Sequence, residues 1–263
     1  MSEPRTWRDA ARIIIMLTRD GGITHAVAKA VRKPTSKFGG RLEPFMHTDL
    51  SFSRGRTNLH TITQAATLHA YTGPIMADYA AYTCASTIAE LAEDLTQNNA
   101  GTTELYTLTH GAFATLAHAQ HTPQRVLTRY LARAMDRSGW PLIGERCTRC
   151  GTPLTPEATA REGTAEAPGR YLAFHTAHTY GQYTVLCPKC APATDAPLTA
   201  LTAEDLAYAL AAASPNPSAW ETIDAAPRGT ADKILKLYLA TTQNLLEHPL
   251  KTFGALEAET PAK

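Results

Sequence analysis

The 263-residue sequence predicts an α+β protein in which a small β-barrel or sandwich precedes an α-helical domain. The β part is expected over residues 1–73 and the helical part over residues 74–263. Short apolar runs between glycines predict the first part, because short strands need frequent turns. Apolar residues at helical spacing predict the second. Two Cys-x-x-Cys pairs add a metal-binding element at about residues 145–192.

Four partly alternating runs predict strands in the first seventy residues. They cover residues 12–18, 23–31, 45–53 and 59–71. Glycines at positions 21, 22, 39, 40 and 55 lie between the runs, where turns are required. Five-stranded barrels of the OB type are built from such strands and often bind single-stranded nucleic acid.

The helical domain begins after Gly73 and Pro74. Its first long helix carries four apolar residues on one face, with Asp78 as the expected N-cap: Cys84, Ile88, Leu91 and Leu95. Further helices are expected at 102–119, at 123–139 after a Thr122 cap, near 203–213, and at 230–247 with Thr230 as N-cap. Residues 153–169 lack aromatic residues and periodicity, so a flexible insertion is expected there.

Positive charge is concentrated near the N-terminus, although the net charge is only +1. Residues 1–60 contain 11 Lys and Arg against 5 Asp and Glu, which indicates a local anionic partner. A solvated loop would explain a charge run alone, but three neighbouring aromatic residues, Phe38, Phe45 and Phe52, favour nucleic acid. The candidate DNA-binding residues are Lys29, Arg32, Lys33, Lys37, Arg41, Arg54 and Arg56.

A second basic feature lies on the helix expected at 123–139. Arg125, Arg129, Arg133 and Arg137 recur every four residues opposite the apolar face. This arginine stripe fits either a solvated helix face or a phosphate-contacting surface, and the sequence leaves both open.

The cysteines predict a structural metal site. Cys147 and Cys150 form one Cys-x-x-Cys pair, and Cys187 and Cys190 form the other. Two such turns supply the four thiolates of a closed tetrahedral Zn²⁺ site, so one zinc ion is expected. A closed site has no position for a catalytic water, and no His-x-Glu motif, phosphate-binding loop or nucleophile elbow occurs. The sequence therefore predicts a binding protein and no enzyme.

No apolar run reaches the roughly 20 residues of a membrane-spanning helix, and no signal peptide is evident. A cytoplasmic protein is expected, in which paired cysteines bind metal more often than they form disulfides.

Several segments together resemble the RecO family of recombinational DNA repair proteins. They are "RIIIMLTRDGGITHAVAKAVRKPTSKFGGRLEPFMHTDL", "LHTITQAATLHAY", "PIMADYAAYTCASTIAELAEDL", "RYLARAMDRSGW", the two cysteine pairs and "YLATTQNLLEHPLKTF". The resemblance implies an OB-fold domain, a helical domain, a zinc element and no enzyme activity. It implies binding to single- and double-stranded DNA, strand annealing, and action with RecR and RecF to load RecA onto strands coated with single-stranded DNA-binding protein.

One segment departs from the family pattern. "WRDAARI" (7–13) aligns with the loop that follows the first strand in family members, so that strand is expected to be missing or to belong to a longer natural product. The alternative interpretation of the whole chain is a zinc-ribbon module that binds RNA or serves transcription. A metal hydrolase is disfavoured by the closed ligand set.

Overall fold

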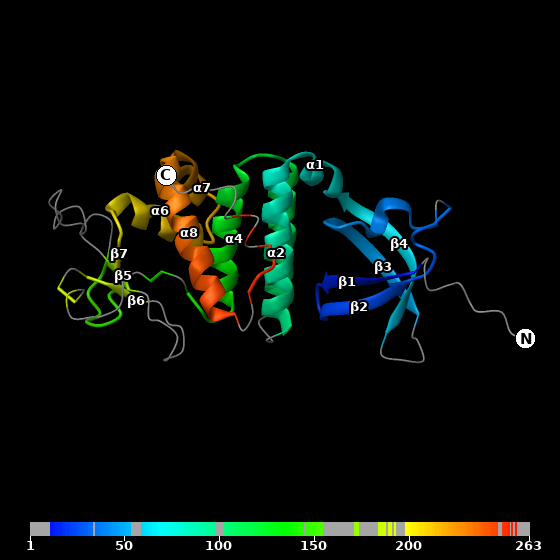
Figure 1. Cartoon of the computed structure of the whole chain (residues 1–263), viewed down its shortest axis with the longest axis horizontal. Helices are drawn as coiled ribbons and strands as arrows, with labels where there is room; N and C mark the ends of the chain where they lie inside the picture. The colour runs from blue at the N-terminus through cyan, green and yellow to red at the C-terminus, as the bar shows by residue number, and fades with distance from the viewer. Residues whose placement is uncertain are drawn as a thin grey trace, which may run out of the picture.

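The computed structural model is described here for residues 11–33, 35–53, 59–97, 102–141, 143–144, 146–154, 171–173, 184–187, 189–190, 192, 198–246, 249–252, 254 and 256. Figure 1 shows an elongated molecule with three parts in a row: a β-sheet, a central group of helices, and a smaller sheet beside the cysteine element. The predicted insertion at 153–169 lies outside the described residues, except for its first two positions. Residues 1–10, where the first strand is expected to be missing, also lie outside them.

The first part is a mixed four-stranded sheet. Its strands are β1 (Arg12–Thr18), β2 (Gly22–Ala28), β3 (Met46–Ser53) and β4 (His60–Ala70), in the order β1-β2-β4-β3. The β1–β2 and β3–β4 pairs are antiparallel, whereas β2 and β4 are parallel. All four predicted strands are confirmed. In the described part of the chain the sheet is open, with β1 and β3 at its edges, so closure into a barrel is not observed.

Alternation along the strands gives the sheet a small apolar core. Ala26, Ala28, Phe38 and Ile62 are buried there, and Ile14 and Met16 of β1 pack against them. Ile13 and Ile15 point to the opposite side and are 59% and 49% exposed. The period of two therefore places one apolar set in the core and leaves the other on the surface.

A larger core lies among the helices. These are α1 (Thr72–Ala77), α2 (Tyr79–Gln97), α3 (Thr102–Ala117), α4 (Pro123–Arg137), α6 (Ala203–Ala213), α7 (Ala219–Ala225) and α8 (Arg228–Leu245). The predicted apolar face of α2 is buried, with Cys84, Ile88 and Leu91 fully inaccessible. α4 packs against α2, α3, α6 and α8, while α2 and α3 also contact the first sheet. The helical domain therefore supports one side of the β part.

The helix caps agree only in part with prediction. Asp78 accepts hydrogen bonds from the backbone N–H groups of Ala80 (2.8 Å) and Ala81 (3.3 Å), as an N-cap should. Thr122 precedes α4, but its side chain makes no capping bond. Thr230 is not the cap of the last helix, because α8 already begins at Arg228 and Thr230 is buried in its first turn.

Short elements that the sequence did not predict complete the fold. They are α1, α7, the 3-10 turn η2 (Gly39–Leu42) and a three-stranded sheet made of β5 (Tyr171–Ala173), β6 (Thr184–Leu186) and β7 (Leu198–Ala200), ordered β6-β5-β7. A helix able to cross a lipid bilayer does not occur among the described residues.

Candidate nucleic-acid interface and metal centre

The basic segment between β2 and β3 folds into consecutive tight turns. Backbone hydrogen bonds link Lys33 to Ala30 (3.2 Å), Ser36 to Lys33 (2.9 Å) and Gly39 to Ser36 (3.2 Å). Ala30 and Gly39 adopt left-handed conformations, with φ of 58° and 52°. Because Gly39 has no side chain, it takes this backbone conformation without strain. The segment is thus a compact, ordered loop.

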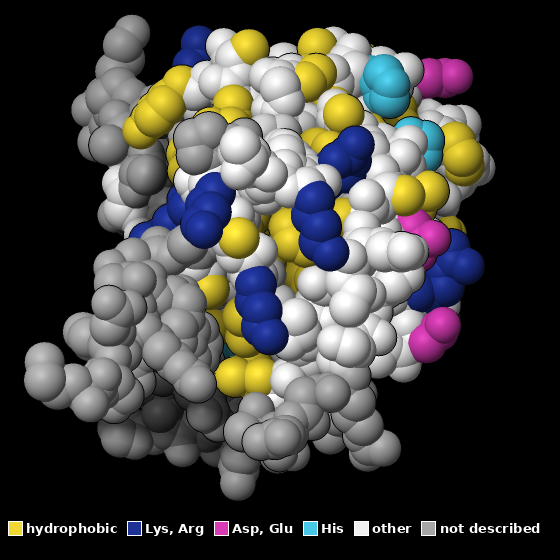
Figure 2. Space-filling view, turned by 90° about the vertical axis from the view of Figure 1, so that its right-hand side faces the viewer, with side chains coloured by type: hydrophobic (Ala, Val, Ile, Leu, Met, Phe, Trp, Pro, Cys, Tyr) yellow, Lys and Arg dark blue, Asp and Glu magenta, His cyan; other side chains and the backbone are white. Residues whose placement is uncertain are grey.

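Five of the seven predicted DNA-binding residues lie on this loop with exposed side chains: Lys29, Arg32, Lys33, Lys37 and Arg41. Arg54 and Arg56 lie outside the described residues. Figure 2 views the sheet end of the molecule and shows Lys and Arg side chains spread over it, with acidic side chains gathered at one margin.

The five basic side chains differ in the hydrogen bonds that they make within the protein. The Lys37 ammonium donates to the Thr63 carbonyl at 2.7 Å, which ties the loop to β4. Arg41 donates to the carbonyls of Lys37 (3.2 Å) and Phe38 (3.3 Å) within the loop. The ammonium groups of Lys29 and Lys33 make no hydrogen bond or ion pair with any described residue. These two ammonium groups therefore keep all their donors for a ligand.

The expected role of the neighbouring aromatic residues needs correction. Phe38 is only 2% exposed and belongs to the sheet core, so it cannot stack on a base. Phe45 is partly buried and makes edge contacts with Phe113 (5.3 Å between ring centroids) and Tyr82 (6.0 Å). Phe52 on β3 is the most exposed of the three, at 39%.

The first half of the arginine stripe of α4, Arg125 and Arg129, is neither a solvated face nor a free phosphate-binding surface. Arg129 is only 6% exposed and donates to the carbonyls of Ala211 (2.9 Å) and Asn216 (3.0 Å). Its guanidinium also lies 5.1 Å from the centroid of the Trp220 ring. These contacts hold the end of α6 and the start of α7 against α4.

Arg125 follows the same pattern, whereas Arg133 and Arg137 do not. Arg125 donates to the carbonyls of Asp224 and Ala226, both at 2.6 Å, at the end of α7. Arg137 pairs with Glu104 of α3 at 2.8 Å, and burial lowers the pKa of Arg133. Carbonyls at helix ends lack intrahelical donors, and arginine side chains supply them here. Arg125 and Arg129 therefore stabilise the packing of α6 and α7 on α4.

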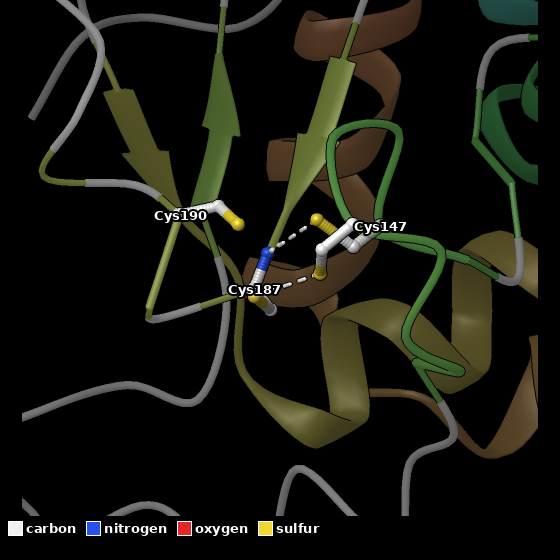
Figure 3. A group of neighbouring side chains, drawn as sticks. Cys147, Cys187 and Cys190 are labelled. Carbon is white, nitrogen blue, oxygen red and sulfur yellow. Dashed lines mark hydrogen bonds between the residues drawn. The ribbon is translucent and has the colours of Figure 1, made fainter.

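All four predicted zinc ligands come together. The sulfur atoms of Cys147, Cys150, Cys187 and Cys190 lie within 4.8 Å of one another, and none is in a disulfide. Cys150 Sγ and Cys187 Sγ are 3.7 Å apart. Neighbouring sulfurs of a tetrahedral site with Zn–S bonds of about 2.3 Å lie about 3.8 Å apart. The three cysteines labelled in Figure 3 point their sulfur atoms toward a common centre.

Two backbone turns position the cysteines. In the first, Cys147 N–H donates to Thr152 at 2.9 Å and Gly151 N–H donates to Cys147 at 2.8 Å, while Gly151 has a φ of 72°. In the second, which directly follows β6, Cys190 N–H donates to the Cys187 carbonyl at 3.0 Å. Cys187 N–H donates to the Cys147 sulfur at 3.4 Å and joins the two turns. Such N–H donors stabilise thiolates.

The electrostatics of the cluster favour a bound cation. The hydroxyl of Thr152, 3.1 Å from the Cys150 sulfur, lowers the pKa of that thiol to about 6. Loss of solvent and the neighbouring thiols raise the pKa of Cys190 to about 12. The thiol of Cys150 thus ionises readily, whereas the thiol of Cys190 resists ionisation. A divalent cation at the centre removes this conflict, because coordinated thiols deprotonate.

Fold and cysteine cluster together define an α+β protein with a basic mixed sheet, a helical domain and a four-cysteine centre suited to a metal ion. The family models agree with this class: residues 3–71 match recombination protein O, N terminal, and residues 76–252 match recombination protein O, C terminal. The chain therefore belongs to the RecO family. It is a non-enzymatic mediator of recombination and DNA repair, which confirms the resemblance seen in the sequence.

Proposed function

We propose that the chain binds single- and double-stranded DNA through the exposed basic loop at residues 29–41 and anneals complementary strands there. The observation that carries the proposal is the contrast between the two basic features. The loop presents five exposed cations, whereas the guanidinium groups of Arg125 and Arg129 in the stripe are hydrogen-bonded to backbone carbonyls of the helical domain. Cations that neutralise phosphates release counterions and remove the repulsion between two strands. Family membership supports DNA as the anion.

We further propose that the four strands are part of an OB-type barrel. The order β1-β2-β4-β3, with a parallel β2–β4 pair, leaves β1 and β3 as edges that a single further strand could join. Phe52 lies on β3 of the same sheet, and its exposed ring could stack on a base. Single-stranded DNA would then follow the loop and contact the ring.

Salt dependence tests the DNA surface. If the five cations neutralise about five phosphates of a single strand, the slope of log K against log[salt] should be roughly −3.5. The variant Lys29→Ala/Arg32→Ala/Lys33→Ala should reduce the magnitude of that slope by about 2. It should weaken all sequences alike, because phosphate contacts carry no base information.

A matched control removes the same charge elsewhere. Arg228, Lys236 and Lys251 are exposed residues on α8 and after it. Their replacement by Ala should leave the slope near its wild-type value. A larger loss from this control variant than from the loop variant would place the DNA surface on the helical domain and refute the proposal.

We propose that Zn²⁺ occupies the four-cysteine centre as one structural ion. The donor set of four thiolates at tetrahedral spacing suits zinc and leaves no open position. RecR, RecF, RecA and single-stranded DNA-binding protein are the proposed partners in the reaction. An annealing assay on complementary strands coated with that binding protein, with and without RecR, tests this role: no stimulation of annealing by the chain would contradict it.

A further inference from the structure

Three histidines that are distant in sequence meet at the junction between the first sheet and α3. His47 on β3 and His69 on β4 are directly opposite partners in the antiparallel register. His110 lies on α3, one helical turn after Tyr106. The ring centroid of His47 is 5.3 Å from that of His69 and 4.3 Å from that of His110. Two strands and one helix therefore each contribute one imidazole.

The ring nitrogens of the three histidines are close enough to share one ion. One nitrogen from each ring lies within 4.8 Å of the other two. Zn–N bonds of about 2.0–2.1 Å require neighbouring nitrogens about 3.3 Å apart, so modest ring rotations would bring them to bonding distance. His69 is exposed while His47 and His110 are half-buried, which leaves a path from solvent.

Two tyrosine hydroxyls hold the rings from behind. His47 Nε2 lies 2.7 Å from the Tyr106 hydroxyl, and His110 Nε2 lies 3.1 Å from the Tyr71 hydroxyl. His47 Nδ1, in contrast, is buried and has no hydrogen-bond partner. An unpartnered buried polar atom destabilises the fold. When Nε2–H donates to Tyr106, the lone pair of Nδ1 is left for a metal, which is the usual arrangement around metal-bound histidine.

Aromatic packing alone would be a simpler explanation for the clustering of the three histidines. Stacked aromatic rings are common at such junctions, and the guanidinium of Arg19, 5.9 Å from the Tyr106 ring centroid, disfavours a nearby cation. Arg19 is exposed, however, so solvent and salt screen its charge. Burial lowers the pKa of His47 and of His110, which favours the neutral imidazole form. Packing does not explain the unpartnered Nδ1.

We propose that His47, His69 and His110 form a second metal site, which binds a divalent transition-metal ion. Three imidazoles suit Zn²⁺, Cu²⁺ or Ni²⁺, and zinc is the expected ion. Three protein ligands leave a fourth position for water or another donor. Because its ligands come from β3, β4 and α3, the bound ion fixes the first sheet to the helical domain.

Zinc titration of the full-length chain, without an affinity tag and stripped by a chelator, tests the site. The wild type should bind two ions, and Cys147→Ser/Cys187→Ser should bind one. The variant His69→Gln/His110→Gln should also bind one, while the double variant of the exposed strand histidines, His25→Gln/His60→Gln, should keep two. Circular dichroism and thermal unfolding verify that each variant is folded.

Two further measurements identify the ligands. In Cys147→Ser/Cys187→Ser, Co²⁺ should give the visible bands of a tetrahedral nitrogen site without a thiolate charge-transfer band. Tyr106→Phe keeps the ring but loses the hydroxyl that orients His47, and should weaken zinc binding at this site about 10–100-fold. Equal zinc content in the wild type and in His69→Gln/His110→Gln would overturn the proposal.

Discussion

Replacement of Arg129 by Ala should destabilise the helical domain by about 1–4 kcal/mol. Each of its two hydrogen bonds comes from a charged donor and contributes about 1.5–3 kcal/mol. The contact with Trp220 adds about 1 kcal/mol. Burial, and then repulsion from Arg133, lower the pKa of Arg129 to about 10, which corresponds to an opposing cost of roughly 3 kcal/mol. The guanidinium remains charged at neutral pH.

Urea unfolding followed by tryptophan fluorescence is a suitable assay, because Trp220 lies against Arg129 and stacks on His121 at 3.7 Å between ring centroids. Arg137→Ala is the matched control on the same helix. Arg137 forms an exposed ion pair with Glu104, for which the expected loss is below about 1 kcal/mol. If the two variants lose the same stability within about 0.5 kcal/mol, the structural interpretation of the stripe is refuted.

Three other outcomes are expected. Phe52→Ala should weaken single-stranded DNA binding by about 1–3 kcal/mol without unfolding the sheet, whereas Phe38→Ala should cost about 3–5 kcal/mol of stability; binding titrations and thermal melts separate the two effects. Removal of zinc from the cysteine centre, or Cys147→Ser/Cys187→Ser, should increase hydrogen exchange at residues 146–154 and 184–190 while the helices stay protected; global unfolding would contradict this. Thr202→Ala should lower the stability of α6 by about 1 kcal/mol, because Thr202 and Asp205 form a reciprocal capping box, and an unchanged urea midpoint would argue against that role.

The strands and the cysteine centre could be predicted from the sequence, because both depend on local patterns. Alternation identified β1 at its observed bounds, and the paired spacing identified all four clustered cysteines. The role of Arg129 could not be predicted, because a four-residue repeat does not reveal that the short helix α7 covers that face. Phe38 was misjudged because its neighbours are charged, although its own side chain is buried.

The three-histidine cluster gave no sequence signal at all. His47, His69 and His110 share neither a motif nor a regular spacing, and only the β3–β4 register and the docking of α3 bring them together. Glu90 shows the same limit. It accepts hydrogen bonds from the backbone N–H groups of Lys251 (2.7 Å) and Thr252 (3.0 Å), which lie far along the chain and share no sequence pattern with it.

The cysteine centre also bears on how such sites are found. Thirty-six residues separate Cys150 from Cys187, yet Thr148 N–H of the first turn donates to the Val185 carbonyl of β6 at 3.1 Å and so holds Cys187 beside that turn. Closing a loop twice as long costs only about 0.6 kcal/mol more, so the length between the two pairs is under weak thermodynamic constraint. A search that demands a fixed spacer would miss this centre, whereas one that asks for two cysteine turns beside a short antiparallel sheet would recover it.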